Sequence, residues 1–391
     1  MARATVTGID IGTYEIRVVI AEQDGRGSLT VIGTGTAESR GIRHGYVTHP
    51  HEVSESIAYA VAKAQEQAGV KIKRAFVAIG GIGLGSVVVQ SSVIVSRADS
   101  EITPLDIKKV HEQCEKDIPG AATLNRKILH NVPLQYKIDG KVVLGKPEGM
   151  KAHKLEVKML FITCLEHHLN DVLQAVEEGG IQVDDVMASP IAASLVVLSK
   201  SQKIAGCVLA NIGAETVSIA VFENNMPVSL EVFPIGSTDI TNDIALGLKV
   251  PLEEAEQIKL GAVTGNAFPR RKLEEIVEAR LSDIFELIEA HLKKIGRNGL
   301  LPAGAIITGG GSNLGTIEDM ARLALRLPSR RGSIIVNPGE KSNFKDSTWA
   351  VAFGLCMFGA KADDAPAINT GAIAARGMLK GAMAWFKQFL P

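Results

Sequence analysis

The chain has 391 residues, which is long enough for two α/β halves with separate hydrophobic cores. Its 42 basic and 43 acidic residues nearly balance, and this balance argues against a general nucleic-acid-binding protein. The N-terminal MARATVTGID lacks the apolar run of a secretory signal, no segment is long enough to span a membrane, and the four scattered cysteines form no C-x-x-C pair. We therefore expect a cytoplasmic protein with buried thiols.

A strand–turn–strand pattern opens the chain. Residues 8–22 read GIDIGTYEIRVVIAE, in which β-favouring residues stand on both sides of Asp10, Gly12 and Thr13. Aspartate and glycine are turn residues, so this stretch by itself predicts a β-hairpin. The sequence EQDGRGS that follows predicts a second turn.

Helical and extended segments then alternate. Apolar spacing predicts a helix over 51–69, and RAFVAIGG predicts a buried strand that runs into a Gly-rich turn. Three strands and one helix between 84 and 165 predict a small α+β module inserted in the first half. A helix over EHHLNDVLQAVEEGG and a strand after it return the chain to the first half.

Histidines gather in two places. His167 and His168 are adjacent, so they point in different directions on the predicted helix. His44, His49 and His51 fall in a predicted loop. We expect these side chains to be solvated rather than to bind a metal.

The opening pattern returns about two hundred residues later. Residues 207–236 read CVLANIGAETVSIAVFENNMPVSLEVFPIG, and the NIGA that begins at Asn211 aligns with the DIGT that begins at Asp10. Self-similarity on this scale predicts two related halves of one fold. Two such turns facing one another would place free backbone N–H groups on both sides of one cleft, an arrangement suited to a triphosphate.

The second half contains further helices and a third glycine-rich stretch. DITNDIALGLKVPLEEAEQIKLGAV predicts two helices separated at Pro251, and KLEEIVEARLSDIFELIEAHLKKIG predicts a long amphipathic helix ending at Gly296. In GAIITGGGSNLG a buried strand runs into three glycines. A plain strand–helix loop explains such glycines equally well in isolation. Beside two phosphate turns they favour nucleotide contact, because glycine permits the close approach of a ligand.

The C-terminal segment has a different composition. Residues 360–374 are small, polar and proline-bearing, as in a linker. In 375–391 the apolar side chains fall on one broad helical face with basic residues at its edge, which is typical of a helix lying in a membrane surface. A terminal helix docked on its own domain is the alternative. The predicted membrane residues are Arg376, Met378, Leu379, Lys380, Trp385, Phe386, Lys387, Phe389 and Leu390.

These residues carry a family resemblance. GIDIGT, NIGAET and ITGGGSNL, in this order and spacing, resemble the motifs of the actin, chaperone and sugar-kinase ATPases. Within that superfamily EITPLDIKKV, ILHNVPLQYKIDG, PEGMKAHKLEVKMLFIT, IGSTDITNDIA and WAVAFGL resemble the FtsA family of bacterial cell-division proteins, and the similar stretches span nearly the whole chain. The resemblance implies a two-lobed, actin-like α/β ATPase fold, duplicated and ribonuclease-H-like, with an inserted α+β subdomain 1C and a C-terminal amphipathic helix.

The resemblance also implies boundaries and a function. Subdomain 1A would comprise 1–83 and 166–194, 1C 84–165, 2A 195–236 and 304–359, 2B 237–303, the linker 360–374 and the membrane helix 375–391. The implied function is filament formation with ATP and Mg²⁺ in the cleft, and tethering of the FtsZ ring to the cytoplasmic face of the cell membrane at the septum. The implied partners are the FtsZ C-terminal peptide, other division proteins through subdomain 1C, further copies of the chain, and lipid.

Carried onto this sequence, the resemblance implies phosphate contacts from both turns, with Asp10 also ordering magnesium-bound water. Glu256 and Lys259, one helical turn apart, would face the ribose or base. The implied nucleotide-contacting set is Asp10, Gly12, Thr13, Tyr14, Asn211, Gly213, Ala214, Glu215, Thr216, Gly236, Glu256, Lys259, Gly309, Gly310, Gly311 and Asn313. The basic cluster Lys293, Lys294 and Arg297 is available for the FtsZ peptide, and a solvated helix end is the alternative for these residues.

The chain departs from the family pattern in the second turn. Asn211 stands where an aspartate is common, Glu215 places negative charge near the phosphates, and Ser237 stands where a second glycine is common. Backbone amides still cradle phosphate, whereas water activation needs a base, so we expect ATP as an assembly ligand with slow or negligible turnover. A PilM-like scaffold of pilus assembly has a similar layout and is the second hypothesis. The amphipathic tail favours the FtsA resemblance.

Overall fold

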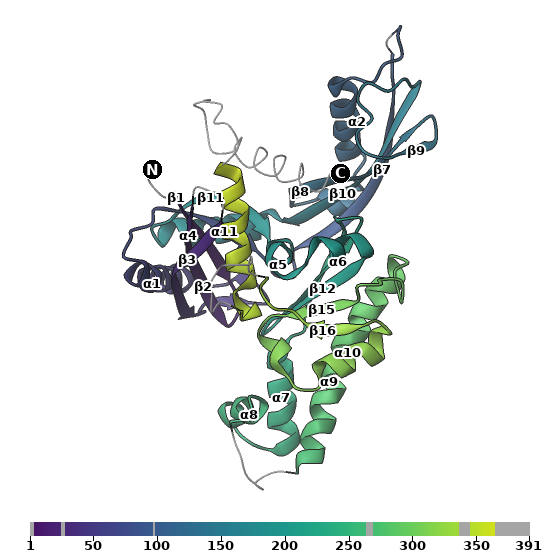
Figure 1. Cartoon of the computed structure of the whole chain (residues 1–391). Helices are drawn as coiled ribbons and strands as arrows, with labels where there is room; N and C mark the ends of the chain where they lie inside the picture. The colour runs from purple at the N-terminus through teal and green to yellow at the C-terminus, as the bar shows by residue number, and fades with distance from the viewer. Residues whose placement is uncertain (1–3, 25–27, 97, 263–268, 336–344, 364–391) are drawn as a thin grey trace.

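The computed structural model describes residues 4–24, 28–96, 98–262, 269–335 and 345–363. Two five-stranded sheets form the centres of two lobes, and a four-stranded module projects from one side (Figure 1). We call these the first sheet, the second sheet and the module. The predicted helix over 375–391 lies outside the described residues.

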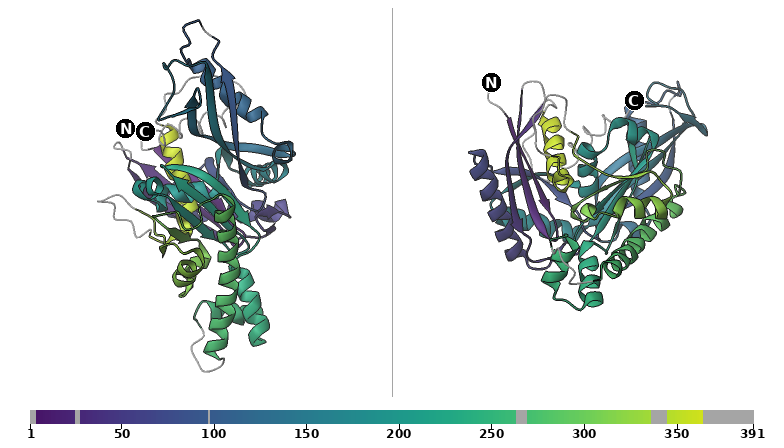
Figure 2. Two further views of the ribbon diagram at one scale, coloured as in Figure 1. Left: turned by 90° about the vertical axis from the view of Figure 1, so that its right-hand side faces the viewer. Right: turned by 60° about the horizontal axis from the view of Figure 1, so that its bottom comes forward.

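The first sheet has the strand order β11-β6-β1-β2-β3, with β2 antiparallel to β1 and β6 parallel to it. Helix α1 covers one face of this sheet and α11 covers the other (Figure 2). Glycine lets α1 approach closely, since a Cβ at Gly35 would lie 1.9 Å from the carbonyl oxygen of Ala60. The elements are β1 (Ala4–Ile11), β2 (Glu15–Gln23), β3 (Leu29–Glu38), α1 (Pro50–Ala68), β6 (Arg74–Ile79), α4 (Glu166–Glu178), β11 (Gln182–Ala188) and α11 (Ala350–Asp363).

The second sheet repeats this plan with the order β14-β13-β12-β15-β16. Here β13 is antiparallel to β12 and β15 is parallel to it, so each strand has a counterpart in the first sheet. The predicted duplication is therefore confirmed. The elements are β12 (Cys207–Ile212), β13 (Val217–Glu223), β14 (Met226–Phe233), α7 (Ser237–Leu248), α8 (Leu252–Lys259), α9 (Arg270–Lys294), β15 (Ala305–Thr308), α10 (Ile317–Leu325) and β16 (Ser329–Arg331).

Two helices join the lobes. Helix α5 (Ser189–Val197) packs against α11, and a Cβ at Gly354 would lie 2.0 Å from the carbonyl oxygen of Ala192, so only glycine permits this contact. The short helix α6 (Lys200–Ala205) then leads into the second sheet. One hydrophobic core runs from the first sheet through these helices to the near face of the second sheet. A separate core lies between the far face and α7 to α10.

The inserted module is confirmed as a small α+β unit. Its sheet has the order β7-β10-β8-β9, with α2 packed on it around a third core. Beyond the three strands and one helix predicted, the module has a fourth strand, β9, and a second, short helix, α3. Although the module is inserted in the first lobe, the Ser86 hydroxyl donates to the Leu230 carbonyl of β14 and accepts from its N–H, both at 2.8 Å. The elements are β7 (Gly85–Ile94), α2 (Pro104–Lys116), α3 (Gly120–Thr123), β8 (Arg126–Ile138), β9 (Lys141–Val143) and β10 (Lys154–Leu165).

Helix α11 corrects two predicted boundaries. It continues to Asp363, so the predicted linker cannot begin at 360. Its packing partners are α5 and the strands of the first sheet, although the predicted segment 304–359 assigns it to the second lobe. The chain thus returns to its first lobe at its last described helix, because the apolar residues of α11 complete the core beneath β1 and β2.

The prediction that the histidines are solvated is wrong for His168. This side chain is 2% exposed, and its Nε2 lies 3.0 Å from the carbonyl oxygen of Gly80. The prediction holds for His167, whose side chain is 91% exposed. His51 lies within α1 rather than in a loop. All four cysteines are buried and free, as predicted, and the described residues contain no cluster of histidine, cysteine or acidic side chains that could hold a metal.

Candidate nucleotide-binding site

A cavity of about 510 Å³ lies where the two hairpin turns face each other. Ligand pockets commonly fall between about 300 and 1,000 Å³, so the cavity is large enough for a small molecule. All but two of the residues implied as nucleotide contacts line it. They are Asp10, Gly12, Thr13, Tyr14, Asn211, Gly213, Ala214, Thr216, Glu256, Lys259, Gly309, Gly310, Gly311 and Asn313.

The two turns are equivalent in register. In the first hairpin Ile11 pairs with Ile16, which places Asp10 opposite Arg17. In the second hairpin Ile212 pairs with Val217, which places Asn211 opposite Ser218. All four of these opposed residues line the cavity. The first lobe therefore offers a carboxylate and a guanidinium where the second offers an amide and a hydroxyl.

The surroundings of Asp10 disfavour the ionised form of its carboxyl group. Burial raises the pKa of this carboxyl from 3.8 to about 6, and the nearby charge of Arg17 only partly offsets this effect. Arg17 is shared with Glu15, whose Oε2 lies 2.7 Å from its Nη2. A cation placed beside Asp10 would favour the ionised carboxylate.

The third glycine stretch is shaped mainly by protein contacts. Gly309 has a φ of 85°, and a Cβ there would lie 2.3 Å from Asn211 Oδ1. A Cβ at Gly311 would lie 2.5 Å from Ile212 Cγ2. These two glycines let the 3₁₀ helix η1 (Gly310–Asn313) pack on β12. Only at Gly310 is the space open, so ligand approach explains that glycine but not its neighbours.

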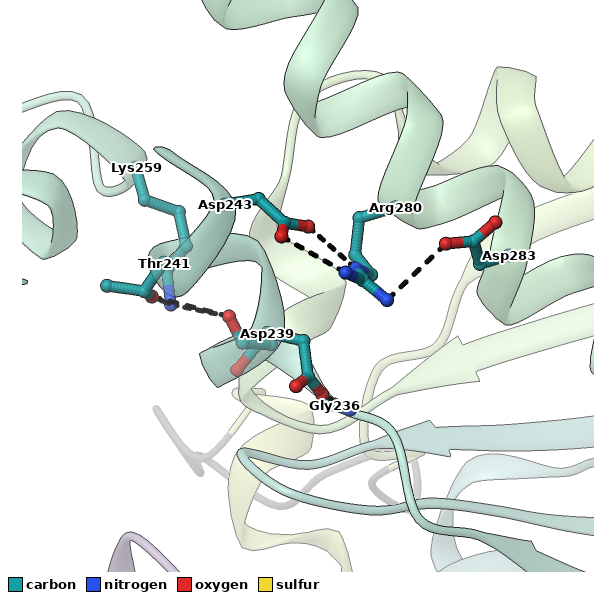
Figure 3. A network of polar contacts seen from close by, with 8 residues as sticks. Gly236, Asp239, Thr241, Asp243, Lys259, Arg280 and Asp283 are labelled. Atoms are coloured by element: carbon teal, nitrogen blue, oxygen red, sulfur yellow. Dashed lines mark hydrogen bonds and ion pairs between the residues drawn. The ribbon is translucent and has the colours of Figure 1, made fainter. Parts of the chain in front are cut away.

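Lys259 and Glu256 project from α8 into a polar network with α7. Lys259 Nζ lies 2.7 Å from Glu256 Oε2, and it donates to Thr241 Oγ1 at 2.8 Å and to the Ser237 carbonyl at 3.2 Å. Thr241 in turn donates to Glu256 at 2.6 Å. Figure 3 shows Lys259 and Thr241 turned toward each other. The Lys259 side chain is only 8% exposed, so its charge is fixed in place at the cavity wall.

Helix α7 is anchored at both sides of this network. Arg280 of α9 binds both carboxylate oxygens of Asp243, at 2.7 and 3.0 Å (Figure 3). At the start of α7, Asp239 accepts the N–H of Gly236 at 2.8 Å. The first residues of α7, Ser237 and Thr238, line the cavity, and their N–H groups donate to the Gly213 and Ala214 carbonyls at 2.9 and 2.8 Å, which joins the helix to the second turn.

The structure corrects the expected roles of Gly236 and Glu215, which do not line the cavity. A Cβ at Gly236 would lie 2.2 Å from the carbonyl oxygen of Ala214, so this glycine lets α7 pack on the second turn. Glu215 does not present its charge to the cavity. Its carboxylate bonds instead to Arg43 and to the backbone of His44 in the first lobe.

Sequence reasoning missed several cavity residues. Arg17 could have been found from hairpin geometry, because a four-residue turn after Ile11 places it opposite Asp10. The Gly-rich turn after β6 was recognised as a turn, but nothing marked it as part of the site. The remaining missed residues that matter here are Gly45, Gly80, Gly81, Ser189, Ser218, Thr241, Ser347 and Thr348, which tertiary packing brings to the cavity.

The predicted partner cluster lies at and just after the C-terminal end of α9. Lys293 pairs with Glu289 at 2.8 Å, and Arg297 pairs with Glu223 of β13 at 2.5 Å. The Lys293 side chain remains 57% exposed. Two of the three cations therefore already have carboxylate partners, and the cluster is less positive than its sequence suggests.

Known proteins resemble the chain over both the lobes and the module. The family model "Cell division protein FtsA" matches residues 208–354, and "SHS2 domain inserted in FTSA" matches residues 85–163. The cell division protein FtsA of Pseudomonas aeruginosa is 30% identical over 375 residues, which cover 90% of this chain and 89% of that protein. The chain belongs to the FtsA family of cell division proteins. The FtsA of Bacillus subtilis is 28% identical over 372 residues, covering 90% of this chain and 82% of that protein.

Solved structures confirm the actin-like fold of this FtsA-family protein. A chain of the PilM–PilN type IV pilus biogenesis complex has a TM-score of 0.65 at 18% identity, covering 92% of this chain and 99% of that one. MreB5 of Spiroplasma citri bound to ADP has a TM-score of 0.51 at 12% identity, and the match covers 93% of this chain and 99% of the MreB5 chain. At these identities the similarity shows the fold alone, so the pilus-assembly hypothesis is not favoured. Membership in the FtsA family gives this chain a place in cell division.

Proposed function

We propose that this FtsA-family protein binds ATP with Mg²⁺ in the cavity between its two hairpin turns and uses the nucleotide as an assembly ligand. The observation that carries the proposal is the equivalence of the turns across one cavity, with Asp10 opposite Arg17 on one side and Asn211 opposite Ser218 on the other. The small, glycine-bearing turns on both sides of the cavity allow the close approach of phosphate groups, and Arg17 adds a cation that Glu15 partly neutralises.

The donor set fits Mg²⁺. This ion keeps several water ligands and binds proteins through one or two carboxylates together with substrate phosphates. Asp10 supplies a carboxylate, Thr13 on the same side of the cavity supplies a hydroxyl oxygen, and Asn211 on the opposite side supplies an amide oxygen. The raised pKa of Asp10 also fits Mg²⁺ binding. Arg17 only partly offsets the cost of burying the ionised carboxylate, so a further cation would stabilise it. When bound, the ion would neutralise phosphate charge and order water near the turns.

Slow turnover is part of the proposal. Among the described residues that line the cavity, the acidic ones are Asp10, Glu15 and Glu256. Glu15 is paired with Arg17, and Glu256 is bonded to Lys259 and Thr241. Asp10 would be occupied by the magnesium shell, and Asn211 offers an amide in place of a second carboxylate. No described lining group is therefore left to activate an attacking water efficiently.

Titration calorimetry with ATP and Mg²⁺, together with phosphate release, tests these statements. We expect saturable binding that weakens when Mg²⁺ is chelated, and phosphate release far below the rates of about 1–100 per second typical of kinases. Absence of binding would remove the nucleotide role from this cavity. Release at kinase rates would contradict the assembly-ligand role.

We further propose that nucleotide-dependent filaments of this protein tether the FtsZ ring to the cytoplasmic face of the membrane at the septum. Family membership supports the division role, and the apolar, basic composition of 375–391 supports the membrane contact. In the described part of the chain, no helix is long and apolar enough to cross a membrane. The module is the proposed contact for other division proteins, and the α9 cluster for the FtsZ peptide.

A further inference from the structure

Glu215 stands in the middle of the second phosphate turn but does not face the cavity. Its neighbours Ala214 and Thr216 both line the cavity, whereas the Glu215 side chain does not and is only 14% exposed. Left to itself, a carboxylate at this position would repel the phosphates that the turn is built to hold. Contacts elsewhere in the structure therefore hold the Glu215 carboxylate away from the phosphate site.

The restraint is a small hairpin of the first lobe. It consists of β4 (Ile42–Arg43) and β5 (Tyr46–Val47), joined by a two-residue turn in which His44 and Gly45 have φ values of 48° and 82°. Positive φ at both positions is the type I′ turn, whose twist matches a tight hairpin and which favours glycine at the second position. We call this element the clasp hairpin.

The clasp hairpin is seated on the first lobe. Its tip packs on the Gly-rich turn after β6, where a Cβ at Gly45 would lie 2.2 Å from the Cα of Gly81. The Ile82 N–H donates to the His44 carbonyl at 3.3 Å. At its base, the Tyr46 ring contacts the buried His168 ring edge-on at 4.9 Å. The tip is thus fixed by backbone packing that no larger residue at Gly45 would allow.

From this position the tip reaches across to the second lobe. The His44 N–H donates to Glu215 Oε2 at 2.6 Å, and Arg43 Nη1 donates to Glu215 Oε1 at 3.0 Å. His44 Nδ1 also lies 3.2 Å from the Glu215 carbonyl oxygen. Both carboxylate oxygens and the backbone of the turn are therefore held by one first-lobe element.

Building on the proposed nucleotide function, we propose that the clasp hairpin is a positioning element for the second phosphate turn. Arg43 and the His44 amide bind the Glu215 carboxylate and keep its charge out of the phosphate site. The clasp therefore acts on ATP affinity by removing the repulsion between the Glu215 carboxylate and the phosphates.

The test is ATP affinity in a double-substitution cycle on the full chain. Arg43→Ala should weaken Mg²⁺-ATP binding about tenfold, because it leaves the Glu215 charge without its cation, held by the His44 N–H alone, beside the phosphates. Glu215→Gln alone should bind within about twofold of wild type, because the amide oxygen still accepts from His44. Arg43→Ala combined with Glu215→Gln should return to wild-type affinity, and Arg43→Lys should retain most of it.

Controls separate this idea from its rivals. Arg40→Ala removes a neighbouring cation, whose side chain is 67% exposed and pairs with Glu38, and should leave affinity unchanged. The Arg43→Ala defect should shrink as salt rises, since screening weakens the repulsion. A double variant as weak as Arg43→Ala would overturn the proposal, because Arg43 would then contact nucleotide directly or merely tie the lobes. Wild-type affinity in the Arg43→Ala variant would also overturn the proposal. Failure of wild type itself to bind ATP would instead contradict the proposed function.

Discussion

Replacing Asp10 by asparagine should stabilise the nucleotide-free protein while weakening its response to Mg²⁺-ATP. Burial raises the pKa of Asp10 from 3.8 to about 6. Between these values the folded protein keeps a proton that the unfolded chain has lost, so wild-type stability falls as pH rises from about 4 to about 6. Above this range the folded state carries the full penalty of a buried, ionised carboxylate.

The size of this penalty follows from the two pKa values. Each pH unit between 3.8 and about 6 corresponds to about 1.4 kcal/mol, giving up to about 3 kcal/mol at neutral pH. The asparagine side chain has no charge to desolvate and keeps nearly the same shape as aspartate. If the 391-residue chain unfolds as one unit, this gain raises the melting temperature by about 3–4 °C.

Thermal unfolding in a chelator, at several pH values between 4 and 8, measures the effect. The gain in melting temperature from Asp10→Asn should be largest at pH 7–8. It should nearly vanish near pH 4, where the Asp10 carboxyl of the folded wild-type protein is protonated and therefore neutral, like the asparagine amide. Adding Mg²⁺-ATP should then raise the melting temperature of wild type more than that of the variant. Asp319→Asn, at a carboxylate 73% exposed, is the matched control and should show neither effect. A pH-independent difference, or a less stable variant at pH 7, would refute the reasoning.

Three further perturbations test the rest of the site and its proposed partners. Lys259→Gln should weaken ATP binding about tenfold in calorimetry, because it removes a fixed cation at the cavity wall and frees the carboxylate of Glu256; unchanged affinity would exclude a contact between Lys259 and the nucleotide. Charge reversal at Lys293 and Lys294 should weaken binding of the FtsZ C-terminal peptide and its salt dependence in fluorescence anisotropy, and an unaltered titration removes them from the docking face. Protein with Trp385→Glu and Phe386→Glu should no longer co-sediment with anionic liposomes yet still bind nucleotide; sedimentation like wild type would exclude this segment as the membrane contact.

The nucleotide turns could be predicted from sequence because their information is local. Gly12 and Gly213 follow short apolar strands, and turn chemistry alone fixes a hairpin at each place. The internal repeat then predicts two equivalent lobes, since two copies of one pattern fold in the same way. Strand register also follows from turn length, so the pairing of Asp10 with Arg17 was within reach of the sequence.

Tertiary structure alone decided where charged side chains point and which lobe completes which core. Nothing in the order of residues shows that Glu215 is held by a hairpin 171 residues earlier in the chain. The same holds for α11, whose mainly apolar sequence does not show which sheet it covers and whose close approach to β1 and α5 depends on Gly8 and Gly354. Turns and strands are set by neighbours in sequence, whereas side-chain direction and helix docking are set by partners that only the folded chain brings together.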